Sequence, residues 1–334
     1  MKKIIFTNAH IVDPTQKINQ LGSLTVENEK IVNLSFNNIS IKQSKNNEII
    51  DCKKLILAPG FVDLKCHLRV PGDEHKENLS YASEAAASSG ITSLVCMPNT
   101  NPIIDNVSIV ELLQRKARKE SHVKIFSTAS ITKQLQGREL SEFGLLKEAG
   151  AVAFTDAINA VNKSSVMYKA LKYASAFDIL LMQHPEDKEL SAGGSMTAGK
   201  LATELGIKGI PLQAEVIQVE RDLRLAEMTN GRIHFLNIST GLAIDAIRNA
   251  QKKGVKVTCS TSPHYFSLDE ADIKKWRTFS KLSPPLRDKK NLNFIKEGIV
   301  NNIITCITSD HSPHDTDSKD RKSTRLNSSH RCIS

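Results

Sequence analysis

Residues 232–262 read RIHFLNISTGLAIDAIRNAQKKGVKVTCSTS, and this stretch decides the fold. Its two apolar runs, 232–240 and 255–262, have the length and β-branched content of buried strands. Between them, residues 242–254 repeat apolar side chains at spacings of three and four and end at a glycine, as a helix does. This order predicts two parallel strands joined by a helix, in a sheet buried on both faces.

The same alternation recurs along the chain from about residue 58. Strands are expected at 60–68, 91–98, 123–131, 151–157, 178–184, 232–240, 255–262 and 302–310. Helices are expected at 79–90, 108–120, 140–150, 165–176, 195–206, 214–230, 242–254 and 291–301. Eight such units predict an α/β fold, the (β/α)8 barrel. The alternative is an open doubly wound sheet, but no G-x-G-x-x-G follows the first strand.

Both ends of the chain depart from this pattern. Residues 1–57 contain short β-branched runs broken by Asn, Gly and Asp, which predicts a small β module. Residues 320–334 read DRKSTRLNSSHRCIS, and the first eleven can be back-translated into a sequencing-library adapter. We therefore expect a non-native tail there, and a barrel over residues 58–319 that is cut just after its eighth strand.

The composition excludes several classes of protein. The 334 residues are 40% hydrophobic and 24% charged, with 45 Lys and Arg against 36 Asp and Glu. This balance is typical of a globular protein rather than a disordered or fibrous one. No apolar run reaches the roughly 18 residues of a membrane span, and no basic stripe with interleaved aromatics indicates a nucleic-acid partner. The six cysteines include no C-x-x-C pair, so we expect reduced thiols in a cytoplasmic protein.

Chemistry in such a barrel takes place at the carboxyl ends of the strands. In this chain those ends carry polar and ionisable side chains that packing does not explain. Four of them form a nitrogen and oxygen ligand set of the kind that zinc uses in hydrolytic sites: His67, Asp156, His184 and Asp310. One histidine alone would more often be structural, but four such groups at one barrel mouth predict a metal site.

Seven motifs carry a resemblance to a known family. They are PGFVDLKCHLRVPGDEHKE at 59–77, VCMPNTNP at 95–102, LLKEAGAVAFTD at 145–156, HPED at 184–187, ERDLRLAE at 220–227, KLSPPLR at 281–287 and TSDHSPHD at 308–315. Over residues 1–319 the chain resembles the dihydroorotases of the amidohydrolase superfamily, including a divergent alphaproteobacterial group. The resemblance implies a barrel with one or two zinc ions and an accessory β-sandwich that a C-terminal segment completes.

The resemblance also implies a reaction: the reversible cyclisation of N-carbamoyl-L-aspartate to L-dihydroorotate in de novo pyrimidine biosynthesis. Asp310 would accept the proton of the attacking water and return it to the leaving nitrogen. Three residues would bind the substrate carboxylate: Arg69, Asn99 and His314. From the residues alone, Arg69 could instead form a surface ion pair with Glu74 or Glu77.

Five positions depart from the family pattern. Lys65 replaces the first histidine of the strand-one motif, Asn237 replaces a histidine on strand six, and Ser283 replaces an asparagine used at the substrate. The glutamate and the second histidine that the family has around SPHY are altered to Ser260 and Tyr265. An ammonium does not bind zinc unless it is deprotonated, and its charge repels a cation. The sequence is compatible with a single zinc of fewer ligands. It is also compatible with a Lys65 ammonium in place of metal, paired with Asp156 or Asp310.

Three functions therefore stay open. The first is a dihydroorotase with an altered metal site. The second is a catalytically inactive dihydroorotase-like subunit that scaffolds aspartate carbamoyltransferase. The third is a cyclic amidohydrolase of the hydantoinase or allantoinase kind, although those enzymes carry a carboxylated lysine where this chain has Asp156. We expect a small anionic substrate, an oligomer when full length, and no nucleic-acid or membrane partner.

Overall fold

The computed structural model describes residues 3–36 and 47–315, so the tail expected at 320–334 lies outside the described residues. The chain divides into two compact units, Met1–Phe61 and Val62–Ser334. The boundary expected from the sequence lay between residues 57 and 58. Among the helices of the described ranges, none is both long enough and apolar enough to cross a lipid bilayer.

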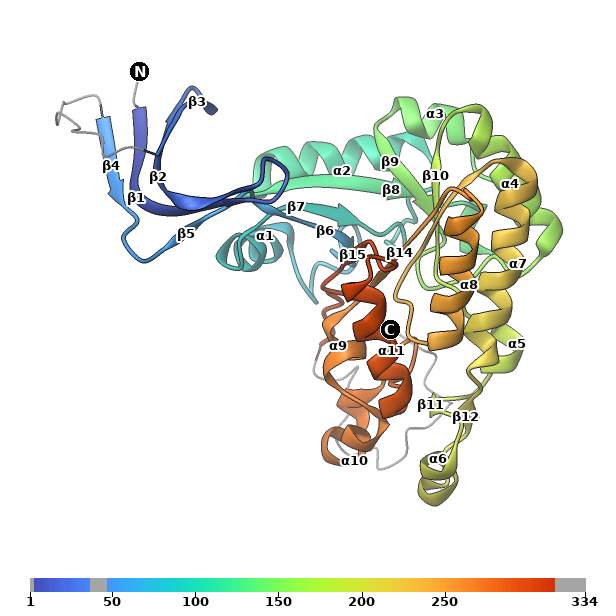
Figure 1. Cartoon of the computed structure of the whole chain (residues 1–334). Coiled ribbons are helices and arrows are strands. Elements are labelled where there is room, and N and C mark those ends of the chain that lie inside the picture. The colour runs from blue at the N-terminus through green and yellow to red at the C-terminus, as the bar shows by residue number, and fades with distance from the viewer. Residues whose placement is uncertain (1–2, 37–46, 316–334) are drawn as a thin grey trace. The chain divides into compact units, whose positions relative to one another are not determined.

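The first unit is a single mixed β-sheet of five strands (Figure 1). The strands are β1 (Lys3–Asp13), β2 (Ile18–Glu27), β3 (Lys30–Ser35), β4 (Asn47–Asp51) and β5 (Ile56–Leu57). β1 pairs antiparallel with β2 and parallel with β4 and β5. Ala9, Ile11 and Cys52 form its small core, whereas Leu21 and Ile31 are exposed. The described residues of this unit thus form one sheet.

The second unit is the predicted barrel. Its strands are β6 (Phe61–Cys66), β7 (Ile91–Cys96), β8 (Lys124–Ala129), β9 (Ala151–Thr155), β10 (Leu180–Gln183), β13 (Arg232–Phe235), β14 (Val257–Thr261) and β15 (Cys306–Ile307). They are ordered β6 to β15 in one sheet, and neighbours from β7 onward pair in parallel. A parallel bridge joins Cys66 to His311, where the amide of His67 donates to the His311 carbonyl at 2.8 Å. This contact nearly closes the barrel, which confirms the predicted fold class.

Helices between the strands cover the outside of the barrel (Figure 1). They are α1 (Leu79–Ser88), α2 (Val107–Glu120), α3 (Phe143–Glu148), α4 (Ser164–Ala176), α7 (Gln213–Thr229), α8 (Gly241–Lys252) and α11 (Lys289–Val300). Their apolar faces share one large core with strand residues such as Phe235. Because side chains alternate along a strand, Met182 and Leu236 face the other way and form a smaller cluster inside the barrel.

Short elements complete the second unit, and one of them corrects a prediction. They are η1 (Lys133–Leu135), α5 (Lys188–Ser191), β11 (Met196–Thr197), α6 (Lys200–Leu205), β12 (Gly209–Ile210), α9 (Pro263–Ser267), η2 (Glu270–Asp272), α10 (Ile273–Trp276) and η3 (Arg277–Ser280). The helix predicted at 195–206 was wrong in its first part, because Met196 belongs to β11, which pairs with β12. Met196 is buried against Tyr265 and Leu286 rather than on a helix face.

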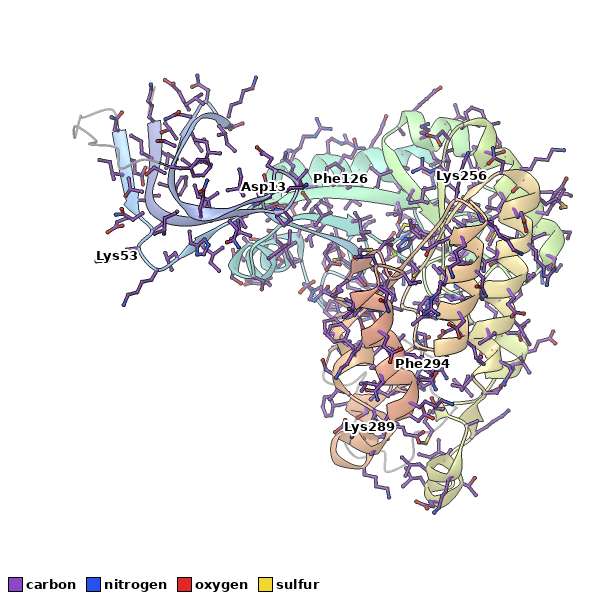
Figure 2. All side chains as sticks on the ribbon, in the orientation of Figure 1. Asp13, Lys53, Phe126, Lys256, Lys289 and Phe294 are labelled. Carbon is purple, nitrogen blue, oxygen red and sulfur yellow. The ribbon has the colours of Figure 1, made fainter. Side chains whose placement is uncertain are left out.

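Helices α8 and α11 approach closely because α8 begins with a glycine. Phe294 of α11, labelled in Figure 2, lies where a Cβ on Gly241 would come within 2.5 Å of its ring. The amide of Gly241 also donates to Oδ1 of Asn291 at 2.9 Å. These contacts hold the start of α8, which follows the strand end that carries Asn237.

A matched pair of truncations in α8 tests this packing. Ile247 is fully buried in the large core, so Ile247→Ala is expected to lower the free energy of unfolding by about 2–5 kcal/mol. Leu242 lies in the same helix but is 52% exposed, so Leu242→Ala is expected to cost about 0.5 kcal/mol or less. Urea denaturation measures both, and equal losses would contradict the arrangement of the helix.

Candidate active site

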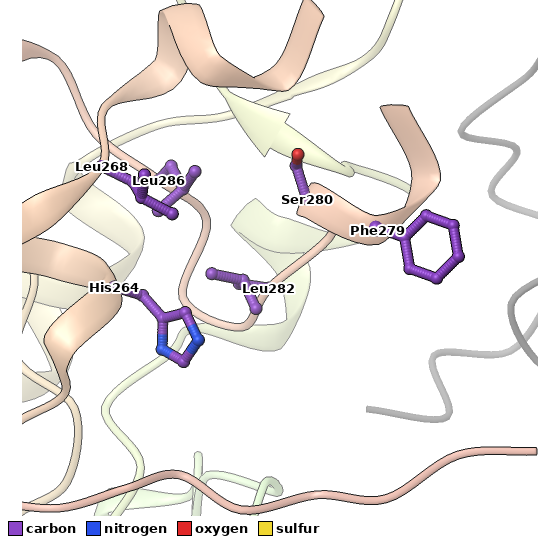
Figure 3. Close-up of a pocket in the computed structure, with 6 residues that line it drawn as sticks. All are labelled: His264, Leu268, Phe279, Ser280, Leu282 and Leu286. Carbon is purple, nitrogen blue, oxygen red and sulfur yellow. The ribbon is translucent and has the colours of Figure 1, made fainter. Parts of the chain in front are cut away.

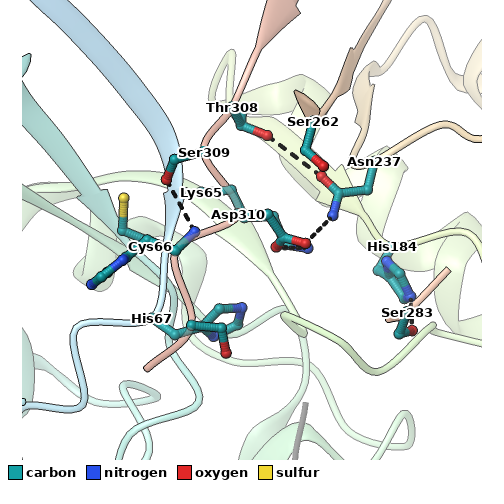
Figure 4. Close-up of polar contacts among 12 residues, drawn as sticks. Lys65, Cys66, His67, His184, Asn237, Ser262, Ser283, Thr308, Ser309 and Asp310 are labelled. Atoms are coloured by element: carbon teal, nitrogen blue, oxygen red, sulfur yellow. Dashed lines mark hydrogen bonds and ion pairs between the residues drawn. The ribbon is translucent and has the colours of Figure 1, made fainter. Parts of the chain in front are cut away.

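The centre of the site is an ion pair between Lys65, on β6, and Asp310, which follows β15. Nζ of Lys65 lies 2.7 Å from Oδ1 of Asp310, and Nδ2 of Asn237 donates to Oδ2 at 2.8 Å (Figure 4). The side chain of Lys65 is 1% exposed and that of Asp310 is 13% exposed. Of the two partners that the sequence left open for Lys65, the structure selects Asp310 and not Asp156.

Two histidines at neighbouring strand ends are each fixed by a hydrogen bond. Nδ1–H of His67 donates to Oδ1 of Asn99 at 2.8 Å. The hydroxyl of Ser283 donates to Oε2 of Glu186 at 3.3 Å, so Nε2–H of His184 is the donor in its 3.0 Å contact with Ser283 Oγ. In His184 the lone pair is therefore on Nδ1, which is buried without a hydrogen-bond partner in the described part of the chain.

Burial and the Lys65 charge set the protonation of the two histidines and of Asp310. Burial, with the Lys65 charge as the second cause, lowers the pKa of His67 to about 3 and that of His184 to about 3. Burial by itself would raise the pKa of Asp310, but the charge and hydrogen bond of Lys65 bring it below the usual value for an aspartate. At neutral pH the site therefore holds an ionised carboxylate and two neutral imidazoles.

Asp156, at the end of β9, is held by a residue from the neighbouring strand end. The backbone N–H of Thr132 donates to Oδ1 at 2.9 Å, and the Thr132 hydroxyl donates to Oδ2. Burial raises the pKa of Asp156 to about 6 in spite of these bonds. Thr132 was missed in the sequence, where its single signal is its position directly after the third predicted strand.

Arg69, just after β6, reaches the loop that follows β15. Its Nε donates to the carbonyl of Pro313 at 3.1 Å, and its Nη2 donates to Oγ of Ser312 at 2.9 Å. The two glutamates considered as its partners pair instead with Lys116 and His311. The guanidinium is therefore anchored at the barrel mouth rather than in a surface ion pair.

Four strand ends share a left-handed backbone. The angle φ is 58° at Arg69, 56° at Ala157, 52° at Asn237 and 57° at Asp310. Left-handed residues other than glycine are uncommon, and they gather at functional sites. The chain after Asp310 continues to His314, which is half-buried. The chain thus turns sharply after β6, which carries Lys65, and again at Asp310 after β15.

The four predicted metal ligands do not form a metal site in this arrangement. Within residues 3–36 and 47–315, no three His, Cys, Asp or Glu side chains are grouped so that they could hold a metal ion. Donors from Lys65 and Asn237 engage both oxygens of Asp310, and donors from Thr132 engage both oxygens of Asp156. The unpartnered histidine nitrogen would suit a metal, but the nearby ammonium opposes a divalent cation. Zinc therefore does not fit the residues present.

A small apolar pocket borders the 281–287 loop. It has a volume of about 150 Å³ and is lined by His264, Leu268, Phe279, Ser280, Leu282 and Leu286 (Figure 3). None of the predicted site residues is among them. The loop nevertheless links the two regions, because Ser283 contacts His184.

A nearly closed parallel barrel with these strand ends has the architecture of the amidohydrolases. Among solved structures, an L-hydantoinase (dihydropyrimidinase) from Arthrobacter aurescens matches with a TM-score of 0.81 and 22% identity, covering 96% of this chain and 71% of that one. A D-hydantoinase structure matches with a TM-score of 0.76 and 23% identity, covering 94% and 69%. Identities this low establish the fold alone.

Sequence comparison gives the family. Residues 53–241 match the dihydro-orotase-like family. The chain is 41% identical over 312 residues to a dihydroorotase of Syntrophus aciditrophicus, covering 93% of this chain and 73% of the relative. It is 43% identical over 319 residues to a dihydroorotase of a Wolbachia of Drosophila simulans, covering 95% and 71%. The chain belongs to the dihydroorotase family, which confirms the resemblance carried by the seven motifs.

Buried His234 predicts a specific acid sensitivity of the fold. Its Nδ1 lies 2.8 Å from Thr258 Oγ1, and burial lowers its pKa to about 4. In the unfolded chain a histidine has a pKa of about 6.5. His234 therefore contributes its full stability above that pH and loses it as the pH falls through about 4.

Between neutral pH and about pH 4, the wild type is expected to lose about 3 kcal/mol more unfolding free energy than His234→Gln. Denaturant titrations at a series of pH values measure the difference. The other buried histidines are present in both proteins, so their contributions cancel when the pH dependence of the unfolding free energy is compared. Parallel pH profiles for the two proteins would contradict a neutral, buried His234.

Proposed function

We propose that this chain interconverts N-carbamoyl-L-aspartate and L-dihydroorotate. The observation that carries the proposal is a largely buried, ionised Asp310 at the mouth of a barrel whose curated relatives are named dihydroorotase. A carboxylate base and an anchored guanidinium suit an anionic cyclic amide. The free thiols of five cysteines in the described residues support a reducing, cytoplasmic location. We also propose an oligomer for the full-length protein, by analogy with the family.

The proposed chemistry uses Asp310 as the proton carrier. In the hydrolytic direction a water oxygen bonds to a ring carbonyl carbon, and the adjacent ring C–N bond breaks. Asp310 takes the proton from the water and gives it to the departing nitrogen; the reverse sequence closes the ring and releases water. The ammonium of Lys65, next to Asp310, would stabilise the oxygen that becomes negative. Because a carboxylate of low pKa is a weak base, we expect slow turnover.

The substrate carboxylate would be bound by Arg69, Asn99 and His314. Ser312 and Pro313 hold Nη2 and Nε of Arg69, and its Nη1 would meet the anion. Oδ1 of Asn99 accepts from a histidine, so its Nδ2 is the atom that would donate to the substrate. His314 follows Pro313 in the same loop and would complete the group.

The central ion pair also favours a second candidate. An inactive family member that scaffolds aspartate carbamoyltransferase needs neither a metal nor a free base. A carboxylate that is engaged by an ammonium and an amide suits such a protein. Absence of dihydroorotate turnover, together with co-purification of the transferase, would select this candidate. Hydantoin and allantoin serve as substrates for the third alternative, another cyclic amidohydrolase.

The role of Asp310 is tested by the variant Asp310→Asn. Loss of the proton carrier is expected to lower kcat for dihydroorotate hydrolysis at least ~100-fold. Absorbance of the cyclic amide follows the reaction, and circular dichroism shows whether the variant is folded. A folded variant with wild-type kcat would remove Asp310 from the mechanism.

The role of Arg69 is tested against an arginine outside the site. Arg69→Ala is expected to lower kcat/KM roughly 10–100-fold, mainly through KM, since a hydrogen bond between charged groups is lost. Arg232→Ala removes an exposed ion pair with Asp178 and should change kcat/KM by less than about twofold. An unchanged KM in the Arg69 variant would exclude it from substrate binding.

A further inference from the structure

We propose that the Lys65 ammonium is the resident cation of this barrel mouth and that the site excludes divalent metal ions. The inference concerns the site of the proposed function but rests on its geometry and not on its turnover. The amount of bound metal therefore tests this inference whether or not the protein is active.

The first argument is the burial of Lys65. It is one of the largest fully buried side chains in the described part of the chain, with 1% of its surface exposed. Lysine is almost never fully buried without a partner, because a buried charge must be compensated. The compensation is Asp310, at 2.7 Å. The ammonium is therefore a built part of the site.

The second argument is the direction of the hydrogen bonds around Asp310. Oδ1 receives the ammonium, and Oδ2 receives Nδ2–H of Asn237. The hydroxyl of Thr308 lies 3.4 Å from Oδ1 of Asn237, which agrees with Nδ2 as the atom that faces Asp310. Two donors thus face the carboxylate where a metal site would present lone pairs to an ion.

The third argument is the consequence of inserting a metal. An ion bound by His67, His184 and Asp310 would displace Lys65 from its carboxylate and leave the ammonium buried without compensation. It would also bring a double positive charge close to a single one in a poorly hydrated site. The other buried carboxylate, Asp156, is engaged by Thr132 and offers no free oxygen in exchange.

The test measures zinc in the untagged full chain. Wild-type protein is dialysed with zinc chloride and then against metal-free buffer, and retained zinc is measured by mass spectrometry. We expect far less than one equivalent and no zinc-induced rise in Tm. The double variant Lys65→His/Asn237→His removes the ammonium and adds two imidazoles. It is expected to retain about one equivalent and to bind zinc at least ~10–100-fold more tightly than the wild type.

A matched control shows whether zinc binding requires the barrel-mouth site or only an added imidazole. Lys133 pairs with Glu139 on the surface, so Lys133→His adds an exposed imidazole and should retain no zinc. If the double variant does not fold, Lys65→Gln replaces it, and zinc is expected to raise its Tm while leaving the wild type unchanged. A wild type that retains one equivalent overturns the proposal. Folded variants that gain no zinc overturn the assignment of Lys65 as the group that excludes metal.

Turnover measured on the same samples distinguishes the two proposals. Zinc-free, active protein supports both. Zinc-free, inactive protein supports the resident ammonium and overturns the proposed activity. Zinc-bound, active protein supports the proposed activity and overturns the resident ammonium.

Discussion

The buried ion pair between Lys65 and Asp310 is the interaction on which the rest of the site depends. Lys65 lies on the first barrel strand and Asp310 follows the last, so the pair spans the seam at which the barrel closes. At the same seam the backbones of Cys66 and His311 form a parallel β-bridge. Removal of either charge would leave the other buried and uncompensated, which is costly in a protein interior. The same ion pair therefore joins the two strands at which the barrel closes and sets the electrostatics of the barrel mouth.

Around this pair, each polar side chain at a strand end is held by a residue from another strand or loop. Asn99 orients His67, Thr132 holds Asp156, and Ser283 fixes His184. The barrel brings these ends together, although they are far apart in the sequence. The result is a polar network with one ionised carboxylate and neutral imidazoles. Such a network has groups that can accept and donate a proton, and within the described residues it lacks the ligand grouping of a metal site.

The sequence was sufficient for the barrel because buried parallel strands and amphipathic helices have local signatures. It failed at 195–206, where a short strand and a helix together imitate one helical period. It also predicted ionisable side chains at the strand ends, but left Lys65 with two partners and missed Thr132 altogether. Those contacts depend on the register of neighbouring strands and on left-handed residues such as Asp310, which leave no periodic trace.

The central claim is that an ammonium, and not a metal ion, occupies the centre of this member of the dihydroorotase family. The most direct measurement is anomalous X-ray diffraction at the zinc edge, from crystals of the protein grown with zinc. The account predicts no anomalous peak beside Asp310 and a Lys65 ammonium in contact with its carboxylate. An anomalous peak bound by His67, His184 or Asp310, with Lys65 displaced, would contradict it.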